Sequence, residues 1–187
     1  MDRAYIIHGW GGSPRSNWFP WLEERSEAEG IRTRTLAMPD PDHPRLSDWL
    51  DGLRAAIGLP DDETFLIGHS LGAMAILRYL ESLEEGERVG GAILVAGFPE
   101  SIGIREIDNF FAPPLDYEKV RLAAGRLAAI NSDNDPYVPL RQGEILRDKL
   151  GAEFSVLAGA YHINQESGFF ELPEALEILK RWKRGKK

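Results

Sequence analysis

Short apolar runs recur along the chain between stretches of amphipathic sequence. Six of the runs have the length and composition of buried strands, and they cover residues 4–8, 31–36, 64–67, 91–95, 126–130 and 153–157. Five other stretches have helical spacing, at residues 18–29, 47–57, 71–83, 140–150 and 172–183. Gly30, Gly58 and Gly151 follow three of these stretches, as glycine often does where a helix ends.

Strands that alternate with helices predict an α/β fold. Consecutive parallel strands require right-handed crossovers, which place helices on both faces of a mostly parallel sheet. We therefore expect a doubly wound α/β domain. A chain of 187 residues, of which 43% are hydrophobic, can bury one good core but not two. This predicts a single domain over residues 1–187.

Residues 97–121 interrupt the alternation. They follow a predicted strand but contain Pro99, Pro113 and Pro114 and mix polar with aromatic side chains, which is typical of a minimal lid. The apolar residues of this insertion either cap the core or form a substrate pocket, and the pattern leaves both readings open. For the pocket reading we expect an apolar site lined by Phe98, Phe110 and Phe111.

Charge is distributed unevenly along the chain. The formal net charge is -8, yet residues 180–187 contain six of the 22 lysines and arginines, so the remainder is strongly acidic. An acidic surface repels phosphate backbones, and we expect no nucleic-acid partner. The basic tail at 180–187 is interpreted as a solvated helix end.

The absence of cysteine from the sequence excludes a thiol nucleophile, disulfides and cysteine-bound zinc. No run reaches the roughly 18 apolar residues of a membrane span, and the first residues do not resemble a signal peptide. We expect a cytoplasmic protein, monomeric or weakly self-associating, that needs no metal or cofactor and acts on a small molecule away from membranes.

A Gly-x-Ser-x-Gly motif follows the third predicted strand, as GHSLG at residues 68–72. An apolar strand precedes it and a helix follows, which is the context of a nucleophile elbow. Glycines at positions 68 and 72 would let strand and helix approach closely around a strained serine. The motif predicts that Ser70 is a nucleophile.

A serine hydroxyl needs a base, and the chain has four histidines. His69 adjoins the serine and would point away from its hydroxyl, His8 lies in the turn after the first strand, and His43 lies among prolines. His162 follows the last strand, where the chain order of this fold places the base. We therefore predict His162 as the base.

The base requires a carboxylate that orients it, in the loop after the fifth strand. Asp133 and Asp135 both lie there, and Asp135 is favoured because Pro136 and Pro139 fix the turn that follows. For the oxyanion we expect two backbone N–H donors, from Leu71 after the nucleophile and from Trp10 in the HGWGG turn, with Gly11 as the next choice.

These motifs together resemble one family. HGWGG at 8–12, GHSLG at 68–72, DPYVP at 135–139 and YHIN at 161–164 are similar to the retinoblastoma-binding-protein-9-like serine hydrolases, across nearly the whole chain. The resemblance implies an α/β-hydrolase fold with strand order 2-1-3-4-5-6 and a triad of Ser70, Asp135 and His162. Where that family often has glycine before the histidine, this chain has Tyr161, which would narrow the pocket.

The sequence therefore predicts a serine hydrolase that cleaves small esters, or amides and peptides, through an acyl-enzyme on Ser70. Phe98, Phe110, Phe111 and Tyr161 are the expected substrate contacts. Two alternatives remain open: a binding module that has kept the fold without the chemistry, and an acyltransferase that uses the same triad.

Overall fold

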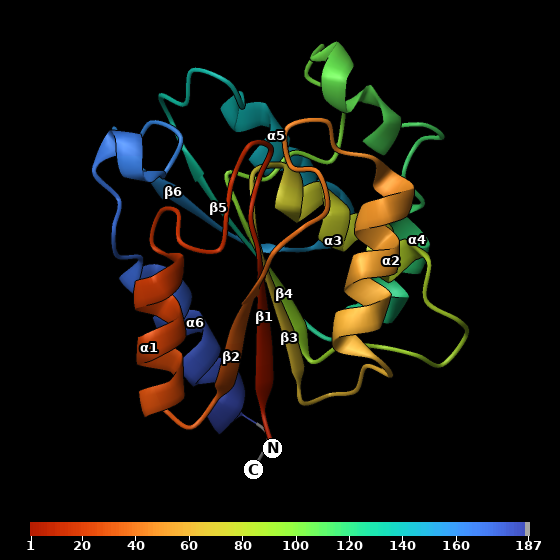
Figure 1. Ribbon diagram of the computed structural model, residues 1–187, viewed down its shortest axis with the longest axis vertical. Coiled ribbons are helices and arrows are strands. Elements are labelled where there is room, and N and C mark those ends of the chain that lie inside the picture. The colour runs from red at the N-terminus through yellow and green to blue at the C-terminus, as the bar shows by residue number, and fades with distance from the viewer. Residues whose placement is uncertain (186–187) are drawn as a thin grey trace.

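The computed structural model describes residues 1–185, which contain one six-stranded sheet. Figure 1 shows how its strands and helices are arranged. Its strands are β1 (Arg3–Ile7), β2 (Arg32–Leu36), β3 (Thr64–His69), β4 (Gly91–Val95), β5 (Leu127–Ser132) and β6 (Glu153–Leu157). All neighbouring strands are parallel, in the order β2-β1-β3-β4-β5-β6. The predicted fold class and strand order are thus confirmed.

Helices cover both faces of the sheet (Figure 1). They are α1 (Phe19–Ala28), α2 (Leu46–Ile57), α3 (Leu71–Glu81), α4 (Tyr117–Ala123), α5 (Leu140–Leu150) and α6 (Pro173–Arg184). One core layer lies under α1 and α6, and the other lies under α2, α3, α4 and α5. The sheet is therefore buried between two hydrophobic layers, as a parallel sheet requires.

The strands β3 and β5 are longer than their apolar runs. Gly68 and His69 continue the pairing with β4, and Asn131 and Ser132 continue the pairing with β6. Backbone hydrogen bonds hold these polar residues in the sheet, and hydrophobicity alone does not report such bonds. The extensions bring β3 up to Ser70 and lead β5 directly into the loop that contains Asp135.

The segment at 97–121 packs onto the core instead of forming an open loop. It contains a short 3₁₀ helix at Arg105–Phe110 and the start of α4, whose first turn is capped by the Asp116 carboxylate. The buried guanidinium of Arg78 on α3 donates from Nε to the Phe110 carbonyl at 2.7 Å and also bonds the Pro113 carbonyl. Arg78 thereby fastens this segment to the helix that follows Ser70.

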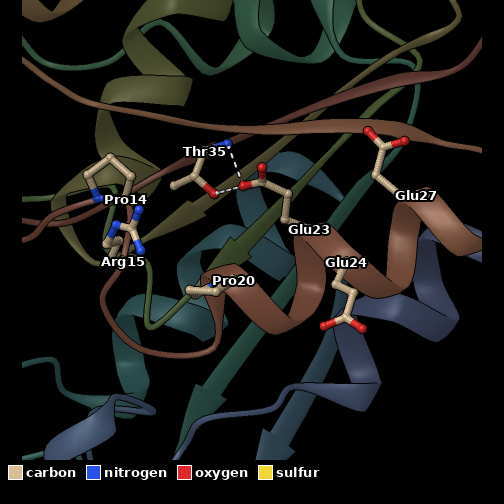
Figure 2. Close-up of a pocket in the computed structure, with 7 residues that line it drawn as sticks. All are labelled: Pro14, Arg15, Pro20, Glu23, Glu24, Glu27 and Thr35. Carbon is tan, nitrogen blue, oxygen red and sulfur yellow. Dashed lines mark hydrogen bonds between the residues drawn. The ribbon is translucent and has the colours of Figure 1, made fainter.

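The edge strand β2 has its outward N–H groups covered by two glutamates of α1. Glu23 Oε2 accepts hydrogen bonds from the backbone N–H of Thr35 at 3.1 Å and from its hydroxyl at 2.8 Å (Figure 2). Glu27 accepts from the N–H of Thr33 at 2.8 Å. The edge therefore presents fewer free donors to another strand.

The basic residues near the C-terminus belong to α6 and make local contacts. Lys180 pairs with Glu177 at 2.8 Å, and Arg181 pairs with Glu153 at 2.5 Å. The carbonyl of Trp182 accepts from Arg126 at the amino end of β5, so α6 ends where β1 begins, at the amino end of the sheet. Lys186 and Lys187 of the predicted tail lie outside the described residues. No helix within residues 1–185 is long and apolar enough to cross a membrane.

Candidate active site

Ser70 occupies a sharp turn between β3 and α3. Its φ of 55° lies in the left-handed region, which is strained for a residue with a Cβ. A Cβ on Gly68 would lie 2.6 Å from the backbone of Ala73, and one on Gly72 would lie 2.3 Å from the Ile7 carbonyl. Both glycines are thus required by close packing, and the turn holds the serine at the carboxyl end of the sheet.

His162 lies between Ser70 and Asp135. Its Nε2 is 3.0 Å from Ser70 Oγ, and its Nδ1 is 2.8 Å from Asp135 Oδ2. The side chain of Asp135 is 1% exposed and that of His162 is 12% exposed. The structure therefore brings together three residues that the sequence places on three separate loops.

Asp135 is held by the turn that follows it. Its Oδ1 accepts from the N–H groups of Tyr137 and Val138, at 2.9 and 3.0 Å, which leaves Oδ2 directed at His162. Asp133 instead accepts from the N–H of Gly159 at 2.7 Å and makes no contact of this kind with the imidazole. The geometry favours Asp135 over Asp133.

The imidazole of His69 is buried against His162 and bonds the backbone of that residue. Its Nε2 donates to the His162 carbonyl at 2.9 Å, and the two rings meet edge to face with centroids 5.0 Å apart. Burial, with a smaller contribution from His162, lowers the pKa of His69 to about 3. His69 is therefore neutral near pH 7 and adds no positive charge beside His162.

The backbone N–H groups of Leu71 and Trp10 are the candidates for an oxyanion site. Leu71 is the first residue of α3, where the helix dipole favours negative charge. Trp10 lies in the β1–α1 loop, fixed by its indole N–H donating to the Asp42 carbonyl at 2.9 Å. Within residues 1–185, neither of these two backbone N–H groups has a hydrogen-bond acceptor.

A small cavity of about 170 Å³ opens at Ser70. It lies between the β1–α1 loop and the loop that follows β6. Its lining comprises Gly9, Trp10, Gly11, Gly12, Ser16, Asn17, His69, Ser70, His162, Asn164, Gln165 and Glu166. Most of these residues are polar or glycine, so the expectation of an apolar pocket is wrong for this cavity.

The aromatic residues expected to bind substrate lie elsewhere. Phe98 and Phe110 are buried in the core layer beneath the 97–121 segment, and Phe111 stacks on Phe98 with ring centroids 5.5 Å apart. None of the three lines the cavity at Ser70. Tyr161 is 55% exposed and also lies outside the lining. A phenylalanine buried in the core removes more apolar area from water than one that lines an open pocket, so core burial stabilises the fold more.

The polar residues of the cavity were missed by sequence reasoning. Asn17, Gln165 and Glu166 lie in loops where polar residues are ordinary, and no spacing links position 17 to position 165. Among the described residues, no three His, Asp or Glu side chains gather as a metal site would require. The contacts in the folded structure therefore identify these two loops as part of the cavity, and the sequence does not.

Comparison with known proteins defines the class. A family model described as serine hydrolase matches residues 4–181, and the chain belongs to this family. It is 37% identical to YdeN of Bacillus subtilis (strain 168), which is named as a hydrolase, over 95% of this chain and 94% of YdeN. It is 29% identical to the serine hydrolase RBBP9 of Rattus norvegicus, over 95% of each chain. The resemblance seen in the sequence motifs is confirmed.

Solved structures agree on the fold. The crystal structure of the ydeN gene product from B. subtilis matches with a TM-score of 0.94 and 36% identity, over 98% of this chain and 100% of that chain. A hydrolase of the α/β superfamily from Xanthomonas campestris pv. campestris matches with a TM-score of 0.67 and 18% identity, over 97% and 99% of the two chains. The fold is that of the α/β hydrolases.

Proposed function

We propose that this serine hydrolase cleaves small carboxylic esters through an acyl-enzyme on Ser70. The observation that carries the proposal is the continuous contact from Ser70 Oγ to His162 Nε2 at 3.0 Å and from His162 Nδ1 to Asp135 Oδ2 at 2.8 Å. A nucleophile, a base and a buried orienting carboxylate are the parts that serine-based acyl transfer requires.

In the first half of the reaction, Ser70 Oγ attacks the ester carbonyl and transfers its proton to His162 Nε2. Asp135 holds the imidazole with Nδ1–H directed at its own Oδ2, so that Nε2 is free to accept the proton, and its charge stabilises the imidazolium. His162 then protonates the leaving alcohol as the carbon–oxygen bond breaks, which leaves an acyl group on Ser70.

In the second half, His162 removes a proton from water as the water attacks the acyl group. Collapse of the tetrahedral intermediate releases the acid and returns the proton to Ser70. In both halves the negative oxygen is stabilised by the N–H groups of Trp10 and Leu71, which are positioned before the charge develops. Each such donor contributes about 3 kcal/mol to lowering the barrier in related acyl-transfer sites.

The test is chemical labelling together with turnover. A fluorophosphonate should label Ser70, and hydrolysis of p-nitrophenyl acetate should fall on the order of a millionfold in Ser70→Ala. Ser101→Ala is the matched control, because Ser101 is an exposed serine bonded to Asp108 on the 97–121 segment. Equal labelling and turnover in Ser70→Ala and the parent would refute the proposal.

A further inference from the structure

Two residues that line the cavity at Ser70 are joined by a pair of reciprocal hydrogen bonds, which we call the Asn17–Gln165 bridge. The backbone N–H of Asn17 donates to Gln165 Oε1 at 3.1 Å, and the backbone N–H of Gln165 donates to Asn17 Oδ1 at 3.1 Å. The Trp18 indole adds a bond to the Ile163 carbonyl at 3.1 Å. Two loops 148 positions apart in sequence are thus joined beside the nucleophile.

The bridge fixes Asn17 in an unusual conformation. Its φ is 56°, in the left-handed region that asparagine tolerates better than most residues. On the other loop, Ile163 has a φ of 51° and is fully buried. Strained backbone on both sides persists only where the surrounding contacts determine it, and the bridge is one of those contacts.

The cavity is small for a substrate site. Its volume is about 170 Å³, whereas pockets for drug-sized ligands are roughly 300–1,000 Å³. A volume below this range favours a short substituent over a long alkyl chain.

The lining is also polar. Ser16, Asn164 and Glu166 line the cavity together with the two residues of the bridge. Trp10 contributes an indole ring, and none of the described lining residues has an aliphatic side chain. Placing a methylene chain against these groups would remove their water without replacing the hydrogen bonds. The cavity therefore discriminates by polarity as well as by size.

We propose that one side of the scissile ester, the group that enters this cavity, is short and polar, and that the Asn17–Gln165 bridge sets its maximum length. This inference rests on the proposed function and adds the substrate class to it. Asn17 and Gln165 are specificity-determining residues in this proposal, because they bound the space beside Ser70 and take no part in proton transfer.

The experiment measures kcat/KM by proton release for two series of esters. One series extends the acyl group from methyl acetate to methyl octanoate, and the other extends the alcohol from methyl acetate to octyl acetate. In the series whose varied group enters the cavity, kcat/KM should fall at least tenfold between the shortest and the longest ester. An apolar pocket would instead raise it by about fourfold for each buried methylene.

Polarity is tested with pairs of equal size. These pairs are 2-hydroxyethyl acetate with propyl acetate, and methyl hydroxyacetate with methyl propionate. For each ester, kcat/KM is divided by the rate constant for its hydrolysis by hydroxide, which corrects for the intrinsic reactivity of the ester. The hydroxylated ester should be preferred at least threefold on the side that shows the length limit. A preference for the alkyl ester on that side would overturn the inference.

Gln165→Ala should lessen the length penalty at least threefold on the same side. Asn109→Ala is the matched control, since Asn109 also joins two segments, bonding the Leu46 N–H and the Pro44 carbonyl, but lies outside the cavity. The inference fails if Gln165→Ala remains folded and its kcat/KM depends on chain length as in the parent. It also fails if Asn109→Ala changes this dependence instead.

Failure of the proposed function would look different. If no ester in either series is cleaved and a fluorophosphonate leaves Ser70 unlabelled, then the acyl-enzyme proposal is wrong and this inference falls with it. If esters are cleaved with a preference for octyl or octanoyl groups, only the inference about the cavity is wrong.

Discussion

The imidazole of His69 holds the backbone carbonyl of His162 in a hydrogen bond of 2.9 Å, although 93 positions separate the two residues. His69 ends β3, immediately before the proposed nucleophile, whereas His162 lies on the loop after β6. Tyr161 and Ile163 on either side of His162 both have positive φ, so this loop is held in a strained path. The bond ties the strained loop to the sheet.

His69→Phe should therefore lower both stability and turnover. It leaves a carbonyl without its donor, at a cost of about 1–3 kcal/mol, and it frees the loop that positions His162. We expect kcat for an acetate ester to fall at least tenfold. His69→Gln, which offers an amide N–H at a similar place, should recover a substantial part of the loss. Equal kcat in the two variants would show that the hydrogen bond does not position His162.

Asp135→Asn should abolish most activity while the protein stays folded. The amide keeps an oxygen for the N–H groups of Tyr137 and Val138, but it offers His162 a donor where an acceptor is needed and selects the wrong tautomer. A loss on the order of 10⁴-fold in kcat is expected.

The matched control for that variant is Asp133→Asn, on the same loop. Its amide oxygen can still accept from Gly159, so kcat should change by less than about threefold. The assignment of the orienting carboxylate would have to be reversed if Asp133→Asn lost activity and Asp135→Asn kept it. Steady-state kinetics and circular dichroism of both variants provide the measurement.

Acidification should begin to destabilise the protein at pH values well above those at which carboxylates become protonated. Burial lowers the pKa of His69 from 6.5 to about 3 and also lowers the pKa of His8. Between about pH 6.5 and 3, the unfolded chain therefore binds a proton at His69 that the folded chain does not. Stability is fully present above pH 6.5 and falls by up to about 1.4 kcal/mol per pH unit for each such histidine.

Urea denaturation between pH 7 and pH 5 measures this slope. In His69→Gln the slope should be shallower, because one of the buried histidines is gone. His43→Gln serves as the control for removal of a histidine, since the His43 side chain is 85% exposed. A parent protein whose unfolding free energy is constant over this pH range would contradict the prediction.

The glutamates beside β2 should contribute to stability and to solubility. In Glu23→Ala, the N–H and hydroxyl of Thr35 lose their acceptor, which should cost about 1 kcal/mol in unfolding free energy. The uncovered edge should also increase light scattering of concentrated samples. Glu23→Gln keeps an acceptor oxygen and should retain most of the stability.

Glu24→Ala is the control on the same helix, because Glu24 points away from Thr35 (Figure 2). Its stability and scattering should match those of the parent. If Glu24→Ala and Glu23→Ala behaved alike, loss of negative charge on α1 would explain the result, and the hydrogen bonds to the edge strand would not.

Ser70, Asp135 and His162 could be predicted because each has a local sequence signal, whereas the strand order came from the family resemblance. Ser70 lies between an apolar strand and a helix, and Pro136 and Pro139 mark the turn after Asp135. Parallel strands then place all such loops at one edge of the sheet. The short helix α4 was missed because it has only seven residues and follows Pro113 and Pro114.

The character of the cavity could not be predicted in this way. From the sequence, Phe110 is equally consistent with a pocket residue and with a core residue. In the structure, the buried guanidinium of Arg78 bonds the Phe110 carbonyl and holds this residue in the core. The Asn17–Gln165 bridge depends on side chains reaching backbone groups of a distant loop. Such contacts follow from the finished fold and leave no periodic pattern in the sequence.

The first strand begins and the last helix ends at the amino end of the sheet (Figure 1). Ser70 directly follows β3, so Ser70 and the cavity that it lines are at the carboxyl end. Attachment through either end of the described chain would therefore leave the cavity facing solution. A support that carries the protein by its terminal helix should retain the free protein's kcat/KM, since small esters would reach Ser70 without passing the point of attachment.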